Sequence, residues 1–201
     1  MNVSVILPAA GLGTRMVPGG GEPPSSRKQF LKLQGSPILI HTIRRFDGCP
    51  SVREIVVALR PDDMEWVAAE VARQSFSKRV RIVAGGDTRQ ESVANALASL
   101  GDDVDLVAVH DAVRPFTPVD KIEAAIAAAA ETGAAILGVV PVDTVKQVHL
   151  HEIRSTIPRE HLVLAQTPQV FRVGLLKEAF AKARAENFIG TDEASLVERL
   201  E

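Results

Sequence analysis

The amino-acid sequence predicts an α/β fold in which helices cover both faces of a doubly wound, mostly parallel, Rossmann-like sheet. Short runs rich in Val, Ile and Leu alternate with longer stretches that have helical periodicity. Such runs are typical of strands buried on both faces, and their alternation with helices is typical of a parallel sheet. A length of 201 residues fits one domain of this kind. The predicted strands are residues 3–7, 55–59, 80–84, 104–109 and 135–140.

Residue patterns that are typical of helix starts occur between these predicted strands. Two places have the spacing of a capping box, and two combine a possible capping hydroxyl with a proline. They predict helices that start at Ser36-Pro37, at Asp62 with Glu65, at Thr88 with Glu91, and at Thr117-Pro118 with Asp120.

The alternation of strand and helix stops after Pro141. Residues 141–171 contain short, alternating, strand-like pieces, and helical sequence resumes near Val173. We interpret 141–171 as an extended β arm inserted into a single domain, residues 1–201. The alternative is a meander at the edge of the sheet, and the sharper hypothesis is an arm that pairs with a second subunit.

Composition excludes several classes of function. The formal net charge of −2 gives no overall attraction to nucleic acid or to an anionic membrane, so small molecules are the expected partners. Cys49 is the only cysteine, which excludes an internal disulfide and a cysteine-rich zinc site. The N-terminus lacks a signal-peptide pattern, and the longest apolar stretch is broken by polar residues. We therefore expect a cytoplasmic protein.

The segment "ILPAAGLGTRM", residues 6–16, follows the first predicted strand. A dinucleotide-binding turn needs a third glycine where Met16 stands, and no Gly-Lys-Ser/Thr sequence for a P-loop occurs in the chain. Glycines let backbone N–H groups approach an anion, and Arg15, Arg27 and Lys28 supply positive charge. We hypothesise a triphosphate-binding loop of a third kind; the alternative is a surface loop with solvated cations.

Two further clusters fall where strands end. Asp111 follows the fourth predicted strand, where a carboxylate can hold Mg²⁺ or simply cap a turn, and Arg114 can bind a phosphate. Gly85 and Asp87 precede a predicted helix whose free N–H groups face the same edge of the sheet, and Ser92 lies in its first turns. Open α/β sheets bind ligands at this edge.

Several motifs together carry a family resemblance. They are "PAAGLGTRM" with "RKQF", "GGDTRQESV" at 85–93, "VHDAVRPF" at 109–116, "VPVDTVK" at 140–146, "TPQVF" at 167–171 and "TDEAS" at 191–195. In this order, over nearly the whole chain, they resemble the 2-C-methyl-D-erythritol 4-phosphate cytidylyltransferases. These belong to the nucleotidyltransferases that join a sugar or polyol phosphate to a nucleoside triphosphate, with a fold of the nucleotide-diphospho-sugar transferase type.

The resemblance implies a reaction. A cytidylyl group passes from CTP to 2-C-methyl-D-erythritol 4-phosphate, giving 4-diphosphocytidyl-2-C-methyl-D-erythritol and pyrophosphate in the non-mevalonate pathway of isoprenoid synthesis. The acceptor phosphate attacks the α-phosphorus in line, and no nucleophilic side chain is needed. Mg²⁺ is the implied cofactor.

The resemblance also implies roles for individual residues. A homodimer forms through the 141–171 arm, whose Thr144 and Arg159 reach the acceptor in the other subunit. The implied residues are Arg15 and Lys28 for catalysis; Pro8, Ala9, Ala10, Gly11, Gly13, Gly85, Asp87 and Ser92 for the nucleotide; Asp111, Arg114, Thr144, Arg159, Thr167 and Thr191 for the acceptor; and Asp111 for the metal.

Alternatives remain open at this point. Ribitol 5-phosphate is a linear polyol phosphate that needs similar cations, so a ribitol-5-phosphate cytidylyltransferase is the nearest alternative. The resembling family continues past the "TDEAS" helix with another strand and a lysine, whereas the sequence given ends at Glu201. A truncated, non-catalytic nucleotide-binding protein is therefore the alternative from a different class.

Overall fold

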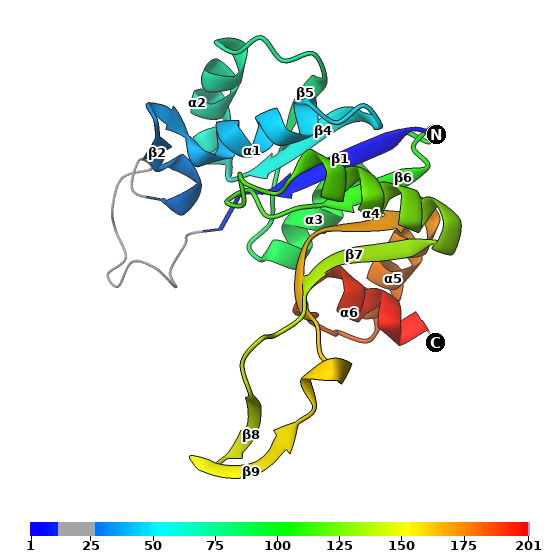
Figure 1. Ribbon diagram of the computed structural model, residues 1–201. Coiled ribbons are helices and arrows are strands. Elements are labelled where there is room, and N and C mark those ends of the chain that lie inside the picture. Colours follow the sequence, from blue (N-terminus) through cyan, green and yellow to red (C-terminus); the bar gives the residue numbers. More distant parts are fainter. Residues whose placement is uncertain (12–26, 201) are drawn as a thin grey trace.

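The computed structural model describes residues 1–11 and 27–200. Its centre is a six-stranded sheet with the strand order β5-β4-β1-β6-β10-β7 (Figure 1). Neighbours among β5, β4, β1 and β6 pair in parallel, whereas β10 is antiparallel to both β6 and β7. The predicted mostly parallel sheet is therefore confirmed. The strands are β1 (Val3–Pro8), β4 (Val52–Leu59), β5 (Arg79–Ala84), β6 (Leu106–Val109), β7 (Ala134–Val139) and β10 (Leu164–Arg172).

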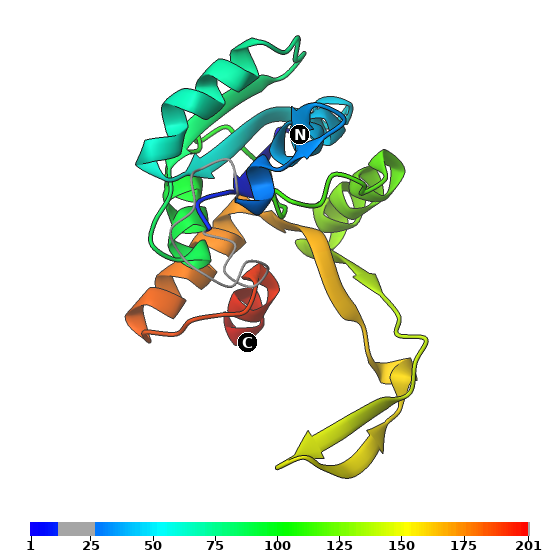
Figure 2. The same ribbon diagram turned by 90° about the vertical axis from the view of Figure 1, so that its left-hand side faces the viewer.

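Helices cover both faces of this sheet (Figure 2). Successive side chains of a strand point to opposite faces. Accordingly Val5 and Leu7 of β1 pack with α1, α2 and α4, while Ile6 packs with α3 and α5. The short α6 packs against α5. The helices are α1 (Ile38–Asp47), α2 (Pro61–Ala72), α3 (Arg89–Ala98), α4 (Val119–Thr132), α5 (Val173–Ala185) and α6 (Glu193–Val197).

All four predicted helices begin within two residues of the predicted starts, but only one of the four predicted caps is confirmed. The capping box at α3 is confirmed, because Thr88 Oγ1 accepts from Glu91 N at 3.1 Å and the Glu91 carboxylate accepts from Thr88 N at 3.0 Å. The predicted caps of α1, α2 and α4 were wrong: their N-caps are Pro37, Arg60 and Pro118, with no capping bond from a side chain. Pro61 is the first residue of α2, where its fixed φ suits a helix start, whereas Pro37 and Pro118 are themselves the N-caps of α1 and α4.

The segment 141–171 has two parts. Strands β8 (Val145–His149) and β9 (Glu152–Ile157) form an antiparallel hairpin that projects from the body (Figures 1 and 2). The chain then returns as β10, which lies between β6 and β7 in the central sheet. This strand was not predicted to be part of the sheet; its register shifts between Ala165 and Gln169, which interrupts any simple alternation.

Within the part of the chain that the structure describes, no helix has both the length and the apolar character that crossing a bilayer requires.

Candidate active site

A cavity of about 880 Å³ opens at the carboxyl ends of β1 and β6, beside the start of α3. Open α/β sheets bind their ligands at this edge. The turns before α3 and α6 and the first half of β10 complete its wall. The structure thus brings together segments that lie far apart in the sequence. The predicted site residues among its lining are Pro8, Ala9, Ala10, Gly11, Lys28, Asp87, Ser92, Asp111, Arg114, Thr167 and Thr191.

Three predicted site residues do not line this cavity. Gly85 lies next to the lining residue Gly86. Thr144 and Arg159 are exposed on the insertion, where the Arg159 guanidinium donates to the carbonyl of Val142. Their cross-subunit role therefore stays a prediction. Gly13 and Arg15 lie outside the described residues.

Gly85 shapes the cavity by allowing close packing. A Cβ at this position would lie 2.8 Å from the Ala10 Cβ and 2.9 Å from the Ser92 hydroxyl. The buried Ser92 Oγ in turn accepts from Gly86 N at 3.1 Å and donates to the carbonyl of Thr88 at 2.8 Å. These contacts fix the turn that carries Asp87 against the end of β1.

Arg27, Lys28 and Gln29 are the first residues after Gly11 that the structure describes. Gln29 is buried, and its Nε2 donates to the carbonyls of Ala9 at 2.8 Å and Gly11 at 3.0 Å. Lys28 lines the cavity. Arg27 does not; its guanidinium pairs with the buried Asp63 of α2. Arg27, one of the three cations of the loop in sequence, is therefore compensated by a buried carboxylate.

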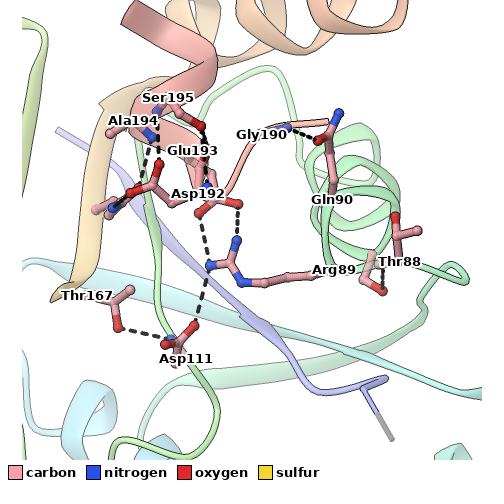
Figure 3. Close-up of polar contacts among 12 residues, drawn as sticks. Thr88, Arg89, Gln90, Asp111, Thr167, Gly190, Asp192, Glu193, Ala194 and Ser195 are labelled. Atoms are coloured by element: carbon pink, nitrogen blue, oxygen red, sulfur yellow. Dashed lines mark hydrogen bonds and ion pairs between the residues drawn. The ribbon is translucent and has the colours of Figure 1, made fainter. Parts of the chain in front are cut away.

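A network of charged side chains borders the cavity; its contacts between Arg89, Asp111 and Glu193 are drawn in Figure 3. Arg89 donates to both carboxylate oxygens of Glu193, at 2.7 and 3.0 Å, and reaches Asp111 Oδ1 at 3.4 Å. Arg114 Nε donates to Asp111 Oδ2 at 2.9 Å, and Arg114 also binds the Gln166 side chain. Glu193 is only 1% exposed, so its charge depends on Arg89 for compensation. Asp111 thus lies between two arginines.

This arrangement controls the charge of Asp111. Burial alone would raise the pKa of its carboxyl, but the Arg114 hydrogen bond and the charges of Arg89 and Arg114 outweigh burial and lower that pKa. For Arg89, burial is likewise outweighed by Glu193 and Asp111, and its pKa is raised. Asp111 is therefore an anion and Arg89 a cation at neutral pH.

Glutamine side chains dock the turn before α6. Gln169 of β10 donates to Asp192 Oδ2 at 2.7 Å and accepts from Ala194 N at 3.0 Å. Gln90 of α3 donates to the carbonyl of Phe188 and accepts from Gly190 N. These bonds bring Thr191 to the cavity. No role was predicted for Arg89, Gln90, Gln169 or Glu193, although all four stand in the motifs "GGDTRQESV", "TPQVF" and "TDEAS".

His110 is a structural residue beside the site. It is fully buried, packs edge to face on Phe46 with ring centroids 4.8 Å apart, and its Nε2 lies 3.0 Å from the carbonyl of Arg114. That bond requires the proton on Nε2. Burial lowers the pKa of His110 to about 4, so the ring is neutral at physiological pH.

The lining can hold a metal ion through a single carboxylate together with substrate phosphates. Among the described residues no three His, Cys, Asp or Glu side chains gather as ligands for a metal. Asp111 is a single carboxylate, already bound by two arginines, but a carboxylate has about four lone-pair sites. Mg²⁺ is commonly held by one or two carboxylates together with substrate phosphates and water. Asp111 fits that mode.

Known proteins share this chain's sequence and architecture. A model of the 2-C-methyl-D-erythritol 4-phosphate cytidylyltransferase (IspD) family matches residues 3–200. The enzyme of that name from Solibacter usitatus is 60% identical over 207 residues, covering 100% of this chain and 84% of that protein. The one from Acidobacterium capsulatum is 54% identical over 204 residues, covering 99% and 85%.

Solved structures of related enzymes have the same fold as this chain. The cytidylyltransferase of the same name from Thermus thermophilus superposes with a TM-score of 0.75 at 33% identity, covering 100% of this chain and 85% of that one. The 4-diphosphocytidyl-2C-methyl-D-erythritol synthase from Anaerococcus prevotii gives 0.85 at 27% identity, covering 98% and 82%.

The open sheet, its two helical layers and these structural matches define an α/β nucleotidyltransferase fold. The family match over residues 3–200 and the 60% identity narrow this class. The chain belongs to the 2-C-methyl-D-erythritol 4-phosphate cytidylyltransferase family.

Glu193→Gln tests the charge network. The change leaves Arg89 without its bidentate carboxylate; because the Arg89 side chain is 34% exposed, water replaces part of the loss. We expect the free energy of unfolding to fall by about 1–3 kcal/mol, measured by urea denaturation. The matched control is Glu186→Gln, which breaks a surface pair with Arg199 and should leave stability unchanged. Equal effects of the two changes would contradict a special role for Glu193.

His110 should make stability depend on pH. Its pKa is about 4 in the folded chain and 6.5 when unfolded, so its contribution is complete above pH 6.5 and is lost as pH falls from 6.5 towards 4. The loss amounts to about 3 kcal/mol, at roughly 1.4 kcal/mol per pKa unit. We expect His110→Gln to flatten the pH dependence of urea unfolding over this window, while His161→Gln, at an exposed position, does not. An unchanged slope in His110→Gln would exclude this explanation.

Proposed function

We propose that this chain transfers a cytidylyl group from CTP to 2-C-methyl-D-erythritol 4-phosphate, releasing pyrophosphate. The main support is one observation: eleven of the site residues that the family resemblance implies line a single cavity at the ligand-binding edge of the sheet. The names of the related enzymes support the choice of substrate.

The proposed chemistry needs no nucleophilic side chain. The acceptor phosphate is an anion at neutral pH and attacks the α-phosphorus in line with the leaving pyrophosphate. The protein supplies positioning and compensates charge at that phosphorus. We assign the compensation to Lys28, which lines the cavity, and to Arg15, which is outside the described residues. Arg114 is the proposed ligand of the acceptor phosphate, with Thr167 and Thr191 beside it.

The charge balance of the lining supports a metal ion as part of the proposal. The described lining holds three cations, Lys28, Arg89 and Arg114, and three carboxylates, Asp87, Asp111 and Asp192. A triphosphate adds several negative charges to this balanced set. Asp111 would hold Mg²⁺, which compensates phosphate charge when bound.

The insertion supports a homodimer. Its hairpin exposes large apolar side chains, with Leu150 77% and Ile153 66% exposed. Contiguous exposed apolar side chains mark interaction surfaces. We therefore propose that two copies associate through residues 141–171, so that Thr144 and Arg159 reach the acceptor held by the partner. A cytoplasmic location is part of the same proposal, and the buried free thiol of Cys49 suits a reducing compartment.

Turnover assays test the reaction. The protein is incubated with CTP, Mg²⁺ and either 2-C-methyl-D-erythritol 4-phosphate or ribitol 5-phosphate, and pyrophosphate release is followed. Family membership does not favour the ribitol alternative, and we expect turnover with the first acceptor. Preference for ribitol 5-phosphate, or CTP binding without turnover on either acceptor, would contradict the proposal.

Lys28→Ala tests the assignment of the cation. We expect kcat to fall about 10²–10³-fold, because one preorganised charge at the reacting phosphorus contributes roughly 3–4 kcal/mol. Lys32→Ala is the control, since Lys32 is exposed on β2 (Lys32–Leu33) and outside the cavity lining. Wild-type rates in a folded Lys28→Ala protein would remove Lys28 from the site.

Ile153→Lys tests the dimer. A charge on the apolar surface of the hairpin should shift the protein from dimer to monomer in sedimentation equilibrium, and turnover should fall if the site is shared. Phe116→Lys adds the same charge at an aromatic side chain on the body that is 70% exposed, and should leave the oligomeric state unchanged. A fully active wild-type monomer at micromolar concentration would refute the shared site.

A further inference from the structure

Residues 27–30 form a turn in which the side chains of Arg27, Gln29 and Phe30 are anchored by contacts with other segments. Arg27 is the N-cap residue of the 3₁₀ turn η2 (Lys28–Phe30), and its carbonyl accepts from Phe30 N at 2.8 Å. Among these four residues, Lys28 and Gln29 line the cavity, and Gln29 is 4% exposed. Lys28 is therefore the charged residue of this turn that lines the cavity.

Three parts of the structure hold this turn in place. Gln29 is bonded to the carbonyls of Ala9 and Gly11 after β1. Phe30 is buried in the core between the sheet and α1, and packs edge to face on Trp66 of α2, with ring centroids 5.0 Å apart. Arg27 binds Asp63, which is also in α2. The turn is thus held to β1, to the core and to α2.

The Arg27–Asp63 pair is built into the structure. The Asp63 side chain is 0% exposed and that of Arg27 is 13% exposed. The Arg27 guanidinium also lies 5.8 Å from the centre of the Phe30 ring, within the range of a cation–π contact. Asp63 stands in the first turn of α2, where the helix dipole favours a carboxylate. Loss of either partner of such a buried pair would leave the other with a largely uncompensated buried charge, so the pair holds the two segments together.

We propose that Arg27 and Asp63 are positioning residues for Lys28: by tying the residue before it to α2, they hold the Lys28 ammonium where the nucleotide phosphates bind. This inference rests on the proposed function. Neither residue lines the cavity, so neither touches the nucleotide. We assign their effect on binding and turnover to the position of Lys28, the charged residue of the turn that lines the cavity. Preorganised charge is worth more than mobile charge, because no reorganisation is required when the substrate binds.

A double-mutant cycle tests the coupling. The dissociation constant of CTP in the presence of Mg²⁺ is measured by calorimetry for the wild type, Asp63→Asn, Lys28→Ala and the double variant, and kcat is measured in parallel. We expect Asp63→Asn to weaken CTP binding about tenfold in the wild-type background, a coupling typical of interacting residues. In the Lys28→Ala background the same change should have almost no effect.

Control variants separate positioning from folding. Glu70→Gln makes the same carboxylate-to-amide change on the same helix, at a residue paired with the largely exposed Arg73, and should leave CTP binding unchanged. Arg27→Lys keeps the charge beside Asp63 but loses the planar group over Phe30, so we expect a smaller loss, about threefold. If circular dichroism shows that Asp63→Asn does not fold, Arg27→Lys replaces it in the double-mutant cycle with Lys28→Ala.

The possible results of the double-mutant cycle distinguish the positioning role from the assignment of Lys28. Loss of CTP affinity only when Lys28 is present supports the proposal. Equal losses in both backgrounds, or wild-type affinity and kcat in a folded Asp63→Asn protein, overturn it and leave the proposed function intact. Wild-type binding by Lys28→Ala overturns the assignment of Lys28 itself, and the positioning role fails with it.

Discussion

The site depends on the contact between Arg89 and Glu193, residues 104 positions apart in the sequence. A carboxylate that is 1% exposed must be compensated by charge, and Arg89 at the start of α3 supplies this with two hydrogen bonds. The contact fixes the turn before α6 as a wall of the cavity. The same guanidinium reaches Asp111, so the position of the α6 segment and the surroundings of Asp111 are set by one group. Figure 3 shows how these contacts converge.

Among the lining residues that the structure describes, positive and negative charges balance before any substrate binds. Asp111 has both oxygens bound by arginines, and Asp192 has both oxygens bound by Ser195 N and the Gln169 side chain. Under the proposed function, a phosphate at Arg114 meets a guanidinium that already binds Asp111 and Gln166. Such a guanidinium favours ligands that bring strong, well-placed negative charge, because a neutral ligand forms weaker hydrogen bonds with it. Selectivity on this wall would then come from charge and hydrogen-bond geometry together.

The sequence predicted the parts of the structure that local patterns determine. Apolar runs located the parallel strands, the Thr88 capping box located the start of α3, and the motifs located most of the cavity lining. Three features depend on contacts between distant segments and have no local signal. They are the place of β10 between β6 and β7, the pairing of Arg27 with Asp63, and the pairing of Arg89 with Glu193. A solvated loop arginine and a buried one look the same in sequence, because burial is decided by the partner.

The insertion raises a different physical question, since its hairpin contacts little of its own chain. Two-stranded hairpins are marginally stable in water without packing on a further surface. Val148, Leu150 and Ile153 are each more than half exposed, so the apolar burial that would stabilise β8 and β9 is absent within one chain. Arg159 binds the Val142 carbonyl at the base of the hairpin, which orients its strands but buries little apolar surface. A second copy that covers these side chains would supply that burial, and would at the same time bring Thr144 and Arg159 towards a cavity other than their own. Under the proposed dimer, the stability of the hairpin and the completion of the acceptor site therefore depend on the same association.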